Sequence, residues 1–316
     1  MLRLCVNLIG LKKRRASFTK MQICELLKSG YSKISLVKEA AFLDVEVILA
    51  YLLGVSKEYL LAHGDEEVSG EDALVFYSYA DRIALGEPVA YITCHKEFYG
   101  NDFFVDKRVL VPRPETEMIV EMVIKFLEGV VKYVDGSQKL KLVDVGTGSG
   151  CIAISIAKHF QEYLDDPLDE VFAVDISEDA LEVCKINIDQ HGLEDKVQAL
   201  QSDLLEFLED GEVCDIIVAN LPYIGEVENR FVEKNVEEFE PNLALFGGND
   251  GLELYKKMFQ QIREKEVKFK LMIGEFGFGQ GEKMRELLSK YFEQDERGIE
   301  EDLAGIERIF FVKKKN

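Results

Sequence analysis

A glycine-rich segment follows an apolar run near the middle of the chain. The run at 142–145 predicts a strand, and Gly146, Gly148 and Gly150 come directly after it, before a helical run that begins at Cys151. Glycines let the backbone turn sharply and remove Cβ atoms, and the first turn of a helix leaves N–H groups free to donate. The sequence therefore predicts a loop in which a ligand with acceptor groups lies against bare backbone.

An acidic residue stands at the end of the next predicted strand, VFAVD, and is Asp175. A carboxylate there can accept hydrogen bonds from both hydroxyls of a ribose. The third glycine comes one residue sooner than in the dinucleotide fingerprint G-x-G-x-x-G, which disfavours a nicotinamide cofactor. The loop with its acidic partner resembles class I S-adenosylmethionine-dependent methyltransferases. That resemblance implies S-adenosylmethionine as cofactor, held by Gly146, Thr147, Gly148, Ser149, Gly150 and Asp175.

A second motif follows the run CDIIVA. The predicted strand ends at Asn220, and Leu221, Pro222 and Tyr223 come directly after it. An N-x-P-Y tetrapeptide at a strand end resembles the motif with which amino-methyltransferases hold a planar NH₂ group, on a glutamine amide or on a base. Two N–H donors need two acceptors, and the Asn220 side-chain oxygen and the Leu221 carbonyl are the expected ones. Pro222 fixes the local φ, and Tyr223 is expected to stack on the planar group.

Catalysis at such a motif consists chiefly of alignment. A planar nitrogen is a poor nucleophile, because its lone pair is delocalised. Holding it in line with the methyl carbon of a sulfonium removes up to about 7–11 kcal/mol of the barrier in well-oriented systems. We therefore expect Asn220, Pro222 and Tyr223 to be the catalytic residues, without a strong base.

The spacing of apolar residues predicts the elements that position these motifs. Residues 21–85 show three- and four-residue spacings typical of several short helices, and 89–111 predicts a hairpin that turns at Gly100. Residues 116–127 predict another helix. Strand-like and helix-like runs then alternate, which is typical of a parallel sheet covered by helices. The predicted strands are 141–145, 171–175, 197–201, 215–219 and 271–276.

The composition limits the classes of function. The 316 residues are 47% hydrophobic and carry a net charge of −21, which predicts a folded chain that does not bind nucleic acid stably. The six cysteines form no C-x-x-C pair, and the four histidines have no ligand spacing, so no metal site is expected. No run is long enough for a membrane helix. We expect a soluble, cytoplasmic protein.

The first 20 residues differ from the rest of the chain. They hold six basic residues and no acidic one. Their order, apolar before basic, is the reverse of a secretory signal. A disordered extension, a weak electrostatic anchor and an organelle transit sequence all remain open for this segment.

Three further segments distinguish among the methyltransferase families. They are VLVPRPETE at 109–117, EPNLALFGGNDGL at 240–252 and DLAGIER at 302–308. With the helical N-terminal region and N-x-P-Y, they resemble the release-factor glutamine methyltransferase family across roughly residues 25 to 313. This resemblance implies an α/β fold in which a class I, Rossmann-like methyltransferase domain follows a small helical domain and a β-hairpin linker. The expected boundaries are a basic extension at 1–20, a helical substrate-recognition domain at 21–88, the hairpin linker at 89–112 and the methyltransferase domain at 113–316.

The resemblance also implies a substrate and further site residues. The family methylates the glutamine amide in the Gly-Gly-Gln motif of class I peptide-chain release factors, and such a protein is expected to act as a monomer. Substrate binding is assigned to Asn220, Leu221, Pro222, Tyr223, Arg113 and Glu115, and Leu204 and Asn220 join the cofactor-binding residues. Arg113 and Glu115 are expected to pair with each other or with the substrate loop. Gly247, Gly248 and Gly251 predict a tight loop, either closing over the site or purely structural.

Leu221 keeps other readings open, because the family commonly has proline at this position. Leucine there is usual in ribosomal RNA adenine dimethyltransferases, so an RNA substrate is one alternative. A glutamine methyltransferase acting on a ribosomal protein is another, although the RPETE string at 113–117 favours release factors. A third alternative is an adaptor that binds the cofactor and performs no chemistry.

Overall fold

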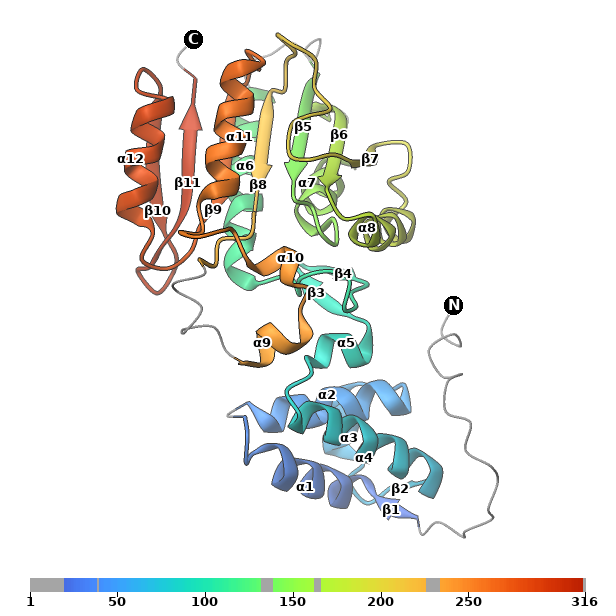
Figure 1. Cartoon of the computed structure of the whole chain (residues 1–316). Coiled ribbons are helices and arrows are strands. Elements are labelled where there is room, and N and C mark those ends of the chain that lie inside the picture. Colours follow the sequence, from blue (N-terminus) through green and yellow to red (C-terminus); the bar gives the residue numbers. More distant parts are fainter. Residues whose placement is uncertain (1–19, 39, 132–138, 162–165, 226–233, 315–316) are drawn as a thin grey trace. The chain divides into compact units, whose positions relative to one another are not determined.

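A computed structural model describes residues 20–38, 40–131, 139–161, 166–225 and 234–314 (Figure 1). Residue contacts divide the chain into two compact units, Met1–Val89 and Ala90–Asn316. Apart from Lys20, the basic N-terminal extension lies outside the described residues. None of the helices in the described ranges has both the length and the apolarity that a membrane span requires.

The N-terminal unit is helical, as predicted. Its helices are α1 (Ile23–Ile34), α2 (Ala41–Leu53), α3 (Lys57–Ala62) and α4 (Gly70–Ala84). Two paired strands of two residues each accompany them, β1 (Met21–Gln22) before α1 and β2 (Glu67–Val68) between α3 and α4. Ser56 and Ser69 cap α3 and α4 by accepting N–H bonds from the first turn. A Cβ on Gly30 of α1 would lie 2.6 Å from Cζ of Phe76, so only glycine lets α1 and α4 pack this closely. The strands were not predicted, since two residues show no alternation.

The next segment is only partly the predicted hairpin. Strands β3 (Lys96–Phe98) and β4 (Asn101–Phe103) pair antiparallel around Tyr99 and Gly100. Residues 89–93, however, form helix α5 (Val89–Thr93), so the prediction of a hairpin from residue 89 was wrong. Pro88 directly precedes this helix, where its fixed φ favours a helix start, and this outweighs the β-branched composition. The contact boundary places the hairpin in the C-terminal unit.

A seven-stranded sheet organises the C-terminal unit, in the order β10-β11-β9-β8-β5-β6-β7. The five predicted strands are confirmed and run parallel. Two further strands were missed, and β11 runs antiparallel to both of its neighbours. β10 has the charged sequence ERGIEE at the sheet edge and therefore carries little apolar signal. The strands are β5 (Leu140–Val145), β6 (Leu168–Asp175), β7 (Val197–Gln201), β8 (Ile216–Ala219), β9 (Leu271–Glu275), β10 (Glu296–Glu301) and β11 (Glu307–Lys313).

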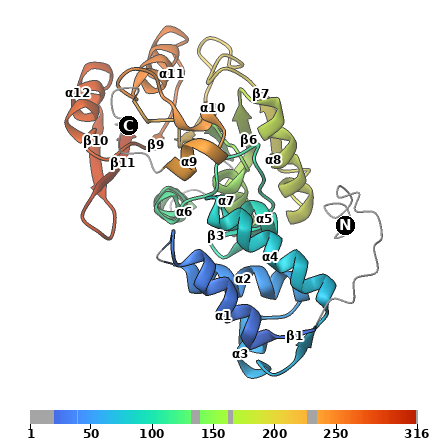
Figure 2. The same ribbon diagram turned by 60° about the horizontal axis from the view of Figure 1, so that its bottom comes forward.

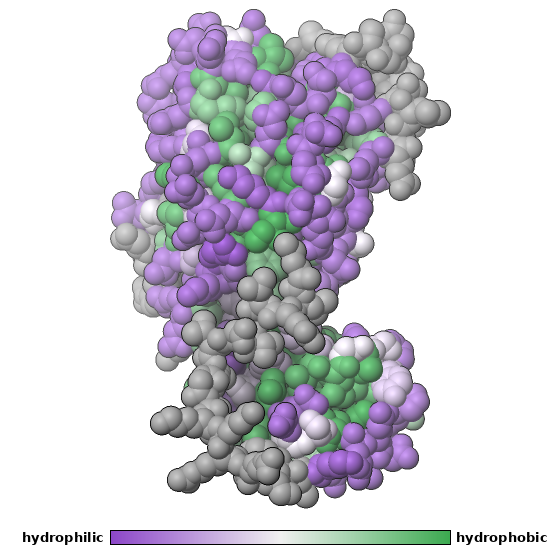
Figure 3. Space-filling model, turned by 90° about the vertical axis from the view of Figure 1, so that its right-hand side faces the viewer, coloured by the Kyte–Doolittle hydropathy of each residue, from purple (hydrophilic) through white to green (hydrophobic). Residues whose placement is uncertain are grey.

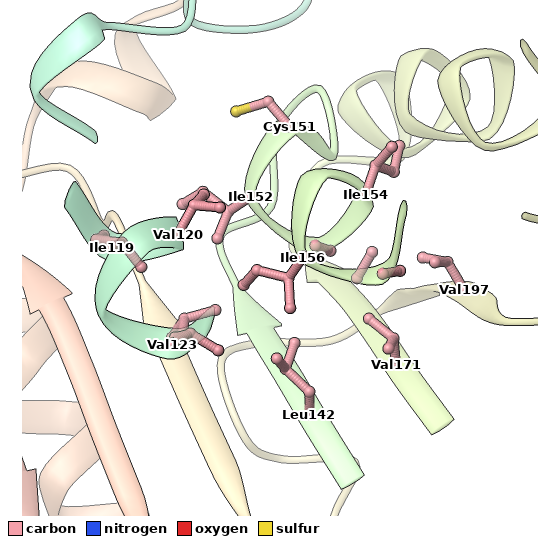
Figure 4. Packing of buried hydrophobic residues seen from close by; sticks show 14 of the residues in the cluster. Ile119, Val120, Val123, Leu142, Cys151, Ile152, Ile154, Ile156, Val171 and Val197 are labelled. Carbon is pink, nitrogen blue, oxygen red and sulfur yellow. The ribbon is translucent and has the colours of Figure 1, made fainter. Parts of the chain in front are cut away.

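Helices cover both faces of this sheet, as Figures 1 and 2 show. One hydrophobic cluster packs α6, α7 and α8 on one face, and a second packs α11 and α12 on the other. Leu142 of β5 joins the first cluster and Val143 the second, so apolar residues of β5 pack on both faces of the sheet. Figure 4 shows Ile152 and Ile156 of α7 over β5. The helices are η1 (Pro114–Thr116), α6 (Glu117–Val131), α7 (Cys151–Gln161), α8 (Glu178–His191), α9 (Lys234–Phe239), α10 (Asn242–Leu245), α11 (Glu253–Glu264) and α12 (Gly281–Tyr291).

The sheet reverses its strand order between β5 and β8. After β5 the chain proceeds outward to β6 and β7, and it then returns to β8 on the other side of β5. Open α/β sheets bind ligands at such a switch point, outside the carboxyl ends of the strands. The glycine loop follows β5 here, and Asn220 follows β8.

Asn187 of α8 joins the segment after the hairpin to the glycine loop. Its Oδ1 accepts from the Phe104 N–H at 2.7 Å, and its Nδ2 donates to the carbonyls of Phe104 at 3.0 Å and Ser149 at 2.8 Å. The side chain is fully buried. Loss of any of these hydrogen bonds would leave a buried polar group without a partner, which lowers the free energy of unfolding.

We predict that Asn187→Asp lowers the free energy of unfolding by about 2–4 kcal/mol, because a carboxylate keeps one acceptor but loses both donors. Urea denaturation of the two chains measures the difference. A loss below about 0.5 kcal/mol would show that Asn187 does not hold these segments together.

Candidate active site

The glycine loop adopts a backbone that other residues rarely adopt. Gly146, Gly148 and Gly150 have φ values of +74°, +55° and +83°. The N–H groups of Gly146 and Thr147 donate to the Val174 carbonyl of β6 at 2.8 and 2.9 Å. A Cβ on Gly150 would lie 2.8 Å from Sγ of Cys184. Conformation and space together explain why these positions are glycine.

A buried carboxylate supports this loop from below. Asp144 of β5 accepts hydrogen bonds at Oδ2 from the Thr147 hydroxyl at 2.7 Å and from the Ala153 N–H at 3.2 Å. Among the described residues, nothing donates to its Oδ1. Burial raises the pKa of Asp144 to about 7, against the effect of its hydrogen bonds. The sequence reasoning missed Asp144, although an aspartate inside the apolar run LVDV was a visible signal.

Asp175 ends β6 beside the same loop. Its Oδ2 accepts from the Gly148 N–H and its Oδ1 from the Ser177 N–H, each at 2.9 Å. Burial raises its pKa, while these hydrogen bonds lower it. Each carboxylate oxygen keeps acceptor capacity beyond its one backbone bond. The carboxylate is therefore both fixed and able to accept from a hydroxyl pair.

A cavity of about 190 Å³ opens above these strand ends. It brings together most of the residues predicted for the site: Gly146, Thr147, Gly148, Ser149, Asp175, Leu204, Asn220, Leu221, Pro222 and Arg113. Gly150, Tyr223 and Glu115 are not among its lining residues. Its wall also includes residues that the sequence did not indicate, among them Arg108, Ile176, Asp203 and Leu243.

Leu204 holds an unusual backbone conformation at the cavity wall. Its φ is +56°, in the left-handed region, and it is 7% exposed. A branched residue there costs backbone energy that the surrounding structure must offset. The Leu204 side chain is therefore fixed beside the cavity by the fold around it.

Asn220 lies where β8 ends, and its amide is oriented by two acceptors. Its Nδ2 donates to the Thr116 hydroxyl at 3.0 Å and to Oε2 of Glu275 at 3.1 Å. Because the NH₂ group faces these oxygens, the carbonyl Oδ1 points away from them. No hydrogen bond to Oδ1 occurs among the described residues. Asn220, which lines the cavity, thus keeps an acceptor that no described group uses.

The residues after Asn220 are held through their backbone. The Ile224 N–H donates to the Leu245 carbonyl and the Gly247 N–H to the Ile224 carbonyl, both at 3.0 Å. A Cβ on Gly247 would be closer to the Pro222 carbonyl oxygen than real Cβ atoms ever come. The second glycine-rich loop, residues 247–251, therefore packs against the backbone of the N-x-P-Y segment.

The RPETE segment does not form the predicted Arg113–Glu115 pair. Arg113 instead donates to Oε1 of Glu240 at 2.6 Å, and the other oxygen of Glu240 accepts from the Val111 N–H at 3.2 Å. The Glu240 side chain is only 2% exposed, whereas Glu115 is exposed. The two pairing residues are 127 positions apart in the chain, which explains why the sequence did not indicate them.

Metal ligands do not gather in the described part of the chain: no three His, Cys, Asp or Glu side chains are placed there to hold an ion. The cysteines described, at 24, 94, 151, 184 and 214, are all free thiols. The chemistry available at the cavity is thus hydrogen bonding and positioning by Asp175, Asn220 and backbone groups.

Comparisons with known proteins agree with this architecture. Residues 25–93 match the family described as PrmC N-terminal domain, and residues 137–269 match a methyltransferase domain family. The chain is 35% identical over 272 residues to the release factor glutamine methyltransferase of Koribacter versatilis, covering 86% of this chain and 91% of that protein. It is 37% identical over 264 residues to the enzyme of that name from Bacillus subtilis, covering 83% and 88%.

A solved structure shares the fold at low sequence identity. It is the hMettl16 catalytic domain in complex with the MAT2A 3′UTR hairpin 6, with a TM-score of 0.54 and 14% identity, covering 75% of this chain and 83% of that one. The likeness supports the class I methyltransferase fold: a central, mostly parallel sheet with helices on both faces.

Asp144 makes a pH-dependent contribution to stability. Because its pKa is raised in the folded chain, the folded state keeps a proton between about pH 4 and pH 7 that the unfolded state releases, so stability falls as pH rises through this window. We predict that Asp144→Asn removes this fall. The free energy of unfolding of the variant minus that of the parent chain should therefore be larger at about pH 8 than at about pH 5. Urea denaturation at both pH values tests it, and an unchanged difference between the chains would contradict the assignment.

Gly247 is predicted to tolerate no side chain. Gly247→Ala must displace the loop or the Pro222 carbonyl, and we expect methyl transfer to slow by at least about tenfold, since small displacements of positioning groups are costly. Gly129→Ala is the matched control, because a Cβ there meets no atom within 4 Å in helix α6. Equal rates for the two variants would show that the loop does not position the motif.

Proposed function

Because this chain belongs to the release factor glutamine methyltransferase family, we propose that it methylates the glutamine of the Gly-Gly-Gln motif in class I peptide-chain release factors. The methyl group comes from S-adenosylmethionine and goes to the side-chain amide nitrogen. The feature that supports this function best is the fixed Asn220 amide, which presents its carbonyl oxygen at the cavity beside the glycine loop.

The cofactor fits the residues around the cavity. The loop that contains Gly146, Gly148 and Ser149 suits the methionine part, because its glycines allow a ligand to approach the backbone closely. Asp175 suits the ribose hydroxyls, since both of its oxygens are fixed and can still accept. Leu204 lies at the same cavity and suits the adenine face. Thr147 holds the loop through Asp144, and Gly150 allows its close packing on Cys184.

The substrate amide needs two acceptors in fixed positions. We propose that Asn220 Oδ1 and the Leu221 carbonyl accept its two N–H groups. Pro222 restricts the backbone between them and Tyr223, and the Tyr223 hydroxyl is held by Oε1 of Glu275 at 3.0 Å. Tyr223 is not among the residues that line the cofactor cavity, and we propose that its ring stacks on the substrate amide.

Alignment is then the main contribution of the protein. S-Adenosylmethionine supplies a methyl group on a positively charged sulfur. Asn220 and Leu221 hold the amide nitrogen toward that group, which is an effect of up to about 7–11 kcal/mol in well-oriented systems. The extra proton on the methylated nitrogen leaves to water after transfer, so no strong base is required.

We propose that the helical unit, residues 21–88, recognises the release factor. Figure 3 shows hydrophobic residues, in green, on one face of this unit, and further apolar side chains are exposed on α1 and α2. Tyr31, Phe42 and Leu43 are 45%, 51% and 51% exposed, and the Tyr31 and Phe42 rings meet edge to face at 6.1 Å. Exposed apolar side chains close together suit a protein partner. Arg113 and the exposed Glu115 are further candidates for substrate contact.

We further propose where the enzyme works, which partner it binds and in which oligomeric state. A translation factor as substrate implies that the enzyme works in the cytoplasm. The net charge of −21 disfavours stable contact with nucleic acid, so the partner is the release factor itself. We propose that the enzyme acts as a monomer.

We predict that the chain, incubated with S-adenosylmethionine and an unmethylated release factor, adds one methyl group to the glutamine of Gly-Gly-Gln. Mass spectrometry of the digested release factor locates the added mass. A release factor with Gly-Gly-Asn in place of Gly-Gly-Gln is the matched substrate control, because its shorter side chain does not reach the same acceptors.

Two variants separate binding from transfer. Asn220→Ala should abolish methylation while the cofactor dissociation constant changes little, and Asp175→Ala should weaken cofactor binding first. Methyl transfer to ribosomal RNA or to a ribosomal protein, with none to release factor, would contradict the proposed substrate.

A further inference from the structure

Glu275, the last residue of β9, is a buried carboxylate that receives hydrogen bonds from three side chains. The Thr116 hydroxyl donates to Oε2 at 2.6 Å, the Asn220 amide donates to Oε2 at 3.1 Å, and the Tyr223 hydroxyl donates to Oε1 at 3.0 Å. Glu275 is 2% exposed. Its three partners come from η1, the end of β8 and the segment after β8, so one carboxylate ties together elements that are far apart in sequence.

The chemistry of the carboxylate decides which way the Asn220 amide faces. An ionised carboxylate only accepts hydrogen bonds, whereas the two ends of an amide differ, one donating and one accepting. With Glu275 behind it, Asn220 turns its NH₂ group inward, because its carbonyl oxygen would otherwise face Oε2 of Glu275, which already accepts from the Thr116 hydroxyl. Thr116 reinforces this choice: its single hydroxyl proton is used on Glu275, which leaves its oxygen to accept from Asn220.

The backbone of Glu275 is fixed independently of its side chain. The Tyr255 hydroxyl, fully buried, donates to the Glu275 carbonyl, and it lies 3.4 Å from the Leu221 amide nitrogen, from which it accepts. Tyr255 therefore ties the end of β9 to the residue after Asn220. The position of Glu275 relative to the N-x-P-Y segment is thus set from two sides.

Burying a carboxylate costs free energy of folding, so a buried carboxylate needs an explanation. Burial raises the pKa of Glu275, and the exposed Glu115 adds to this, while hydrogen bonds from Thr116 and Tyr223 and the charge of Arg308 lower it. Replacing a buried charge by an apolar residue of similar size is often neutral or stabilising for a fold. Stability alone therefore does not account for Glu275.

We propose that Glu275 is a positioning residue that sets the orientation of the Asn220 amide and so keeps Asn220 Oδ1 available as the acceptor for the substrate amide. Its use in methyl transfer rests on the proposed function, but the orientation itself does not. Without the carboxylate, the Asn220 amide is free to turn and to present its NH₂ group, a donor, to the substrate's N–H groups.

A substrate-free experiment tests the orientation. In the ¹⁵N-labelled chain with S-adenosylhomocysteine, the Asn220 side-chain NH₂ signal is identified by its loss in Asn220→Ala. We expect this NH₂ group to be protected from exchange with solvent in the parent chain and to lose that protection in Glu275→Met, which has a similar volume and no acceptor. Glu275→Gln should fall between, because a glutamine can still accept from Asn220 in one of its two orientations.

Kinetics tests the consequence. We expect kcat to fall at least about 100-fold in Glu275→Met and about 3- to 30-fold in Glu275→Gln, with the cofactor dissociation constant within about threefold of the parent value in both. A purely structural role would change stability and cofactor binding together and would not give this order. If the parent chain itself fails to methylate release factor, the proposed function fails, and the exchange experiment still decides the role of Glu275.

Retained protection of the Asn220 NH₂ group in Glu275→Met, or a kcat within about threefold of the parent, would overturn the proposal. If Glu275→Met does not fold, the comparison moves to Thr116→Val and Thr116→Ser, because serine keeps the hydroxyl that orients Asn220. Loss of protection in the valine variant alone supports the proposal, and equal protection in both contradicts it.

Discussion

The parallel pairing of β5 with β8 is the constraint on which the site depends. The pairing sets Val145 opposite Ala219, so the residues that follow both strands emerge side by side at the switch point of the sheet. The two motifs meet directly there: a Cβ on Gly146 would lie 3.0 Å from the Leu221 side chain. Any slip in the register of this pair would separate the glycine loop at 146–150 from the segment at 220–223.

Around that strand pair, buried acidic side chains give the site its rigidity. Asp144 fixes the glycine loop through Thr147, and Glu275 fixes Asn220, each from within the protein. Burial raises the pKa of both, so each costs stability in its ionised form. Both carboxyl groups thus accept hydrogen bonds from neighbouring groups of the chain, which suits the proposed catalysis by alignment.

Local signals in the sequence were enough to predict the parts of the site that lie in one stretch of chain. The glycines at 146–150, Asp175 at a strand end and the tetrapeptide at 220–223 each combine a residue type with a predicted strand, and the cavity contains most of these residues. The family followed from further short segments. The central strand β8 was predictable because both faces of the sheet are covered there, which gives the continuous apolar run IIVA.

What the sequence did not indicate depends on contacts between distant positions. The pairs Arg113–Glu240 and Thr116–Glu275 join residues 127 and 159 positions apart, and no local pattern marks either of them. Asn187 reads as one polar residue among many in α8, although it is fully buried and bonded to two other segments. The antiparallel β10 was missed because charged residues mask its alternation, whereas the apolar run IFFV in β11 was a local signal that was overlooked. Residues 89–93 form helix α5 and not the predicted strand, because the helix start favoured by Pro88 outweighs the strand preference of the β-branched residues.

The central claim is that two acceptors, Asn220 Oδ1 and the Leu221 carbonyl, hold the substrate amide nitrogen toward the cofactor. A crystal structure of the chain with S-adenosylhomocysteine and a Gly-Gly-Gln peptide from a release factor tests it most directly. The account predicts that the glutamine amide nitrogen lies within about 3.2 Å of both oxygens, with the Asn220 NH₂ group still on Glu275. A glutamine amide bound elsewhere, or an Asn220 amide turned with its NH₂ group toward the substrate, would contradict it.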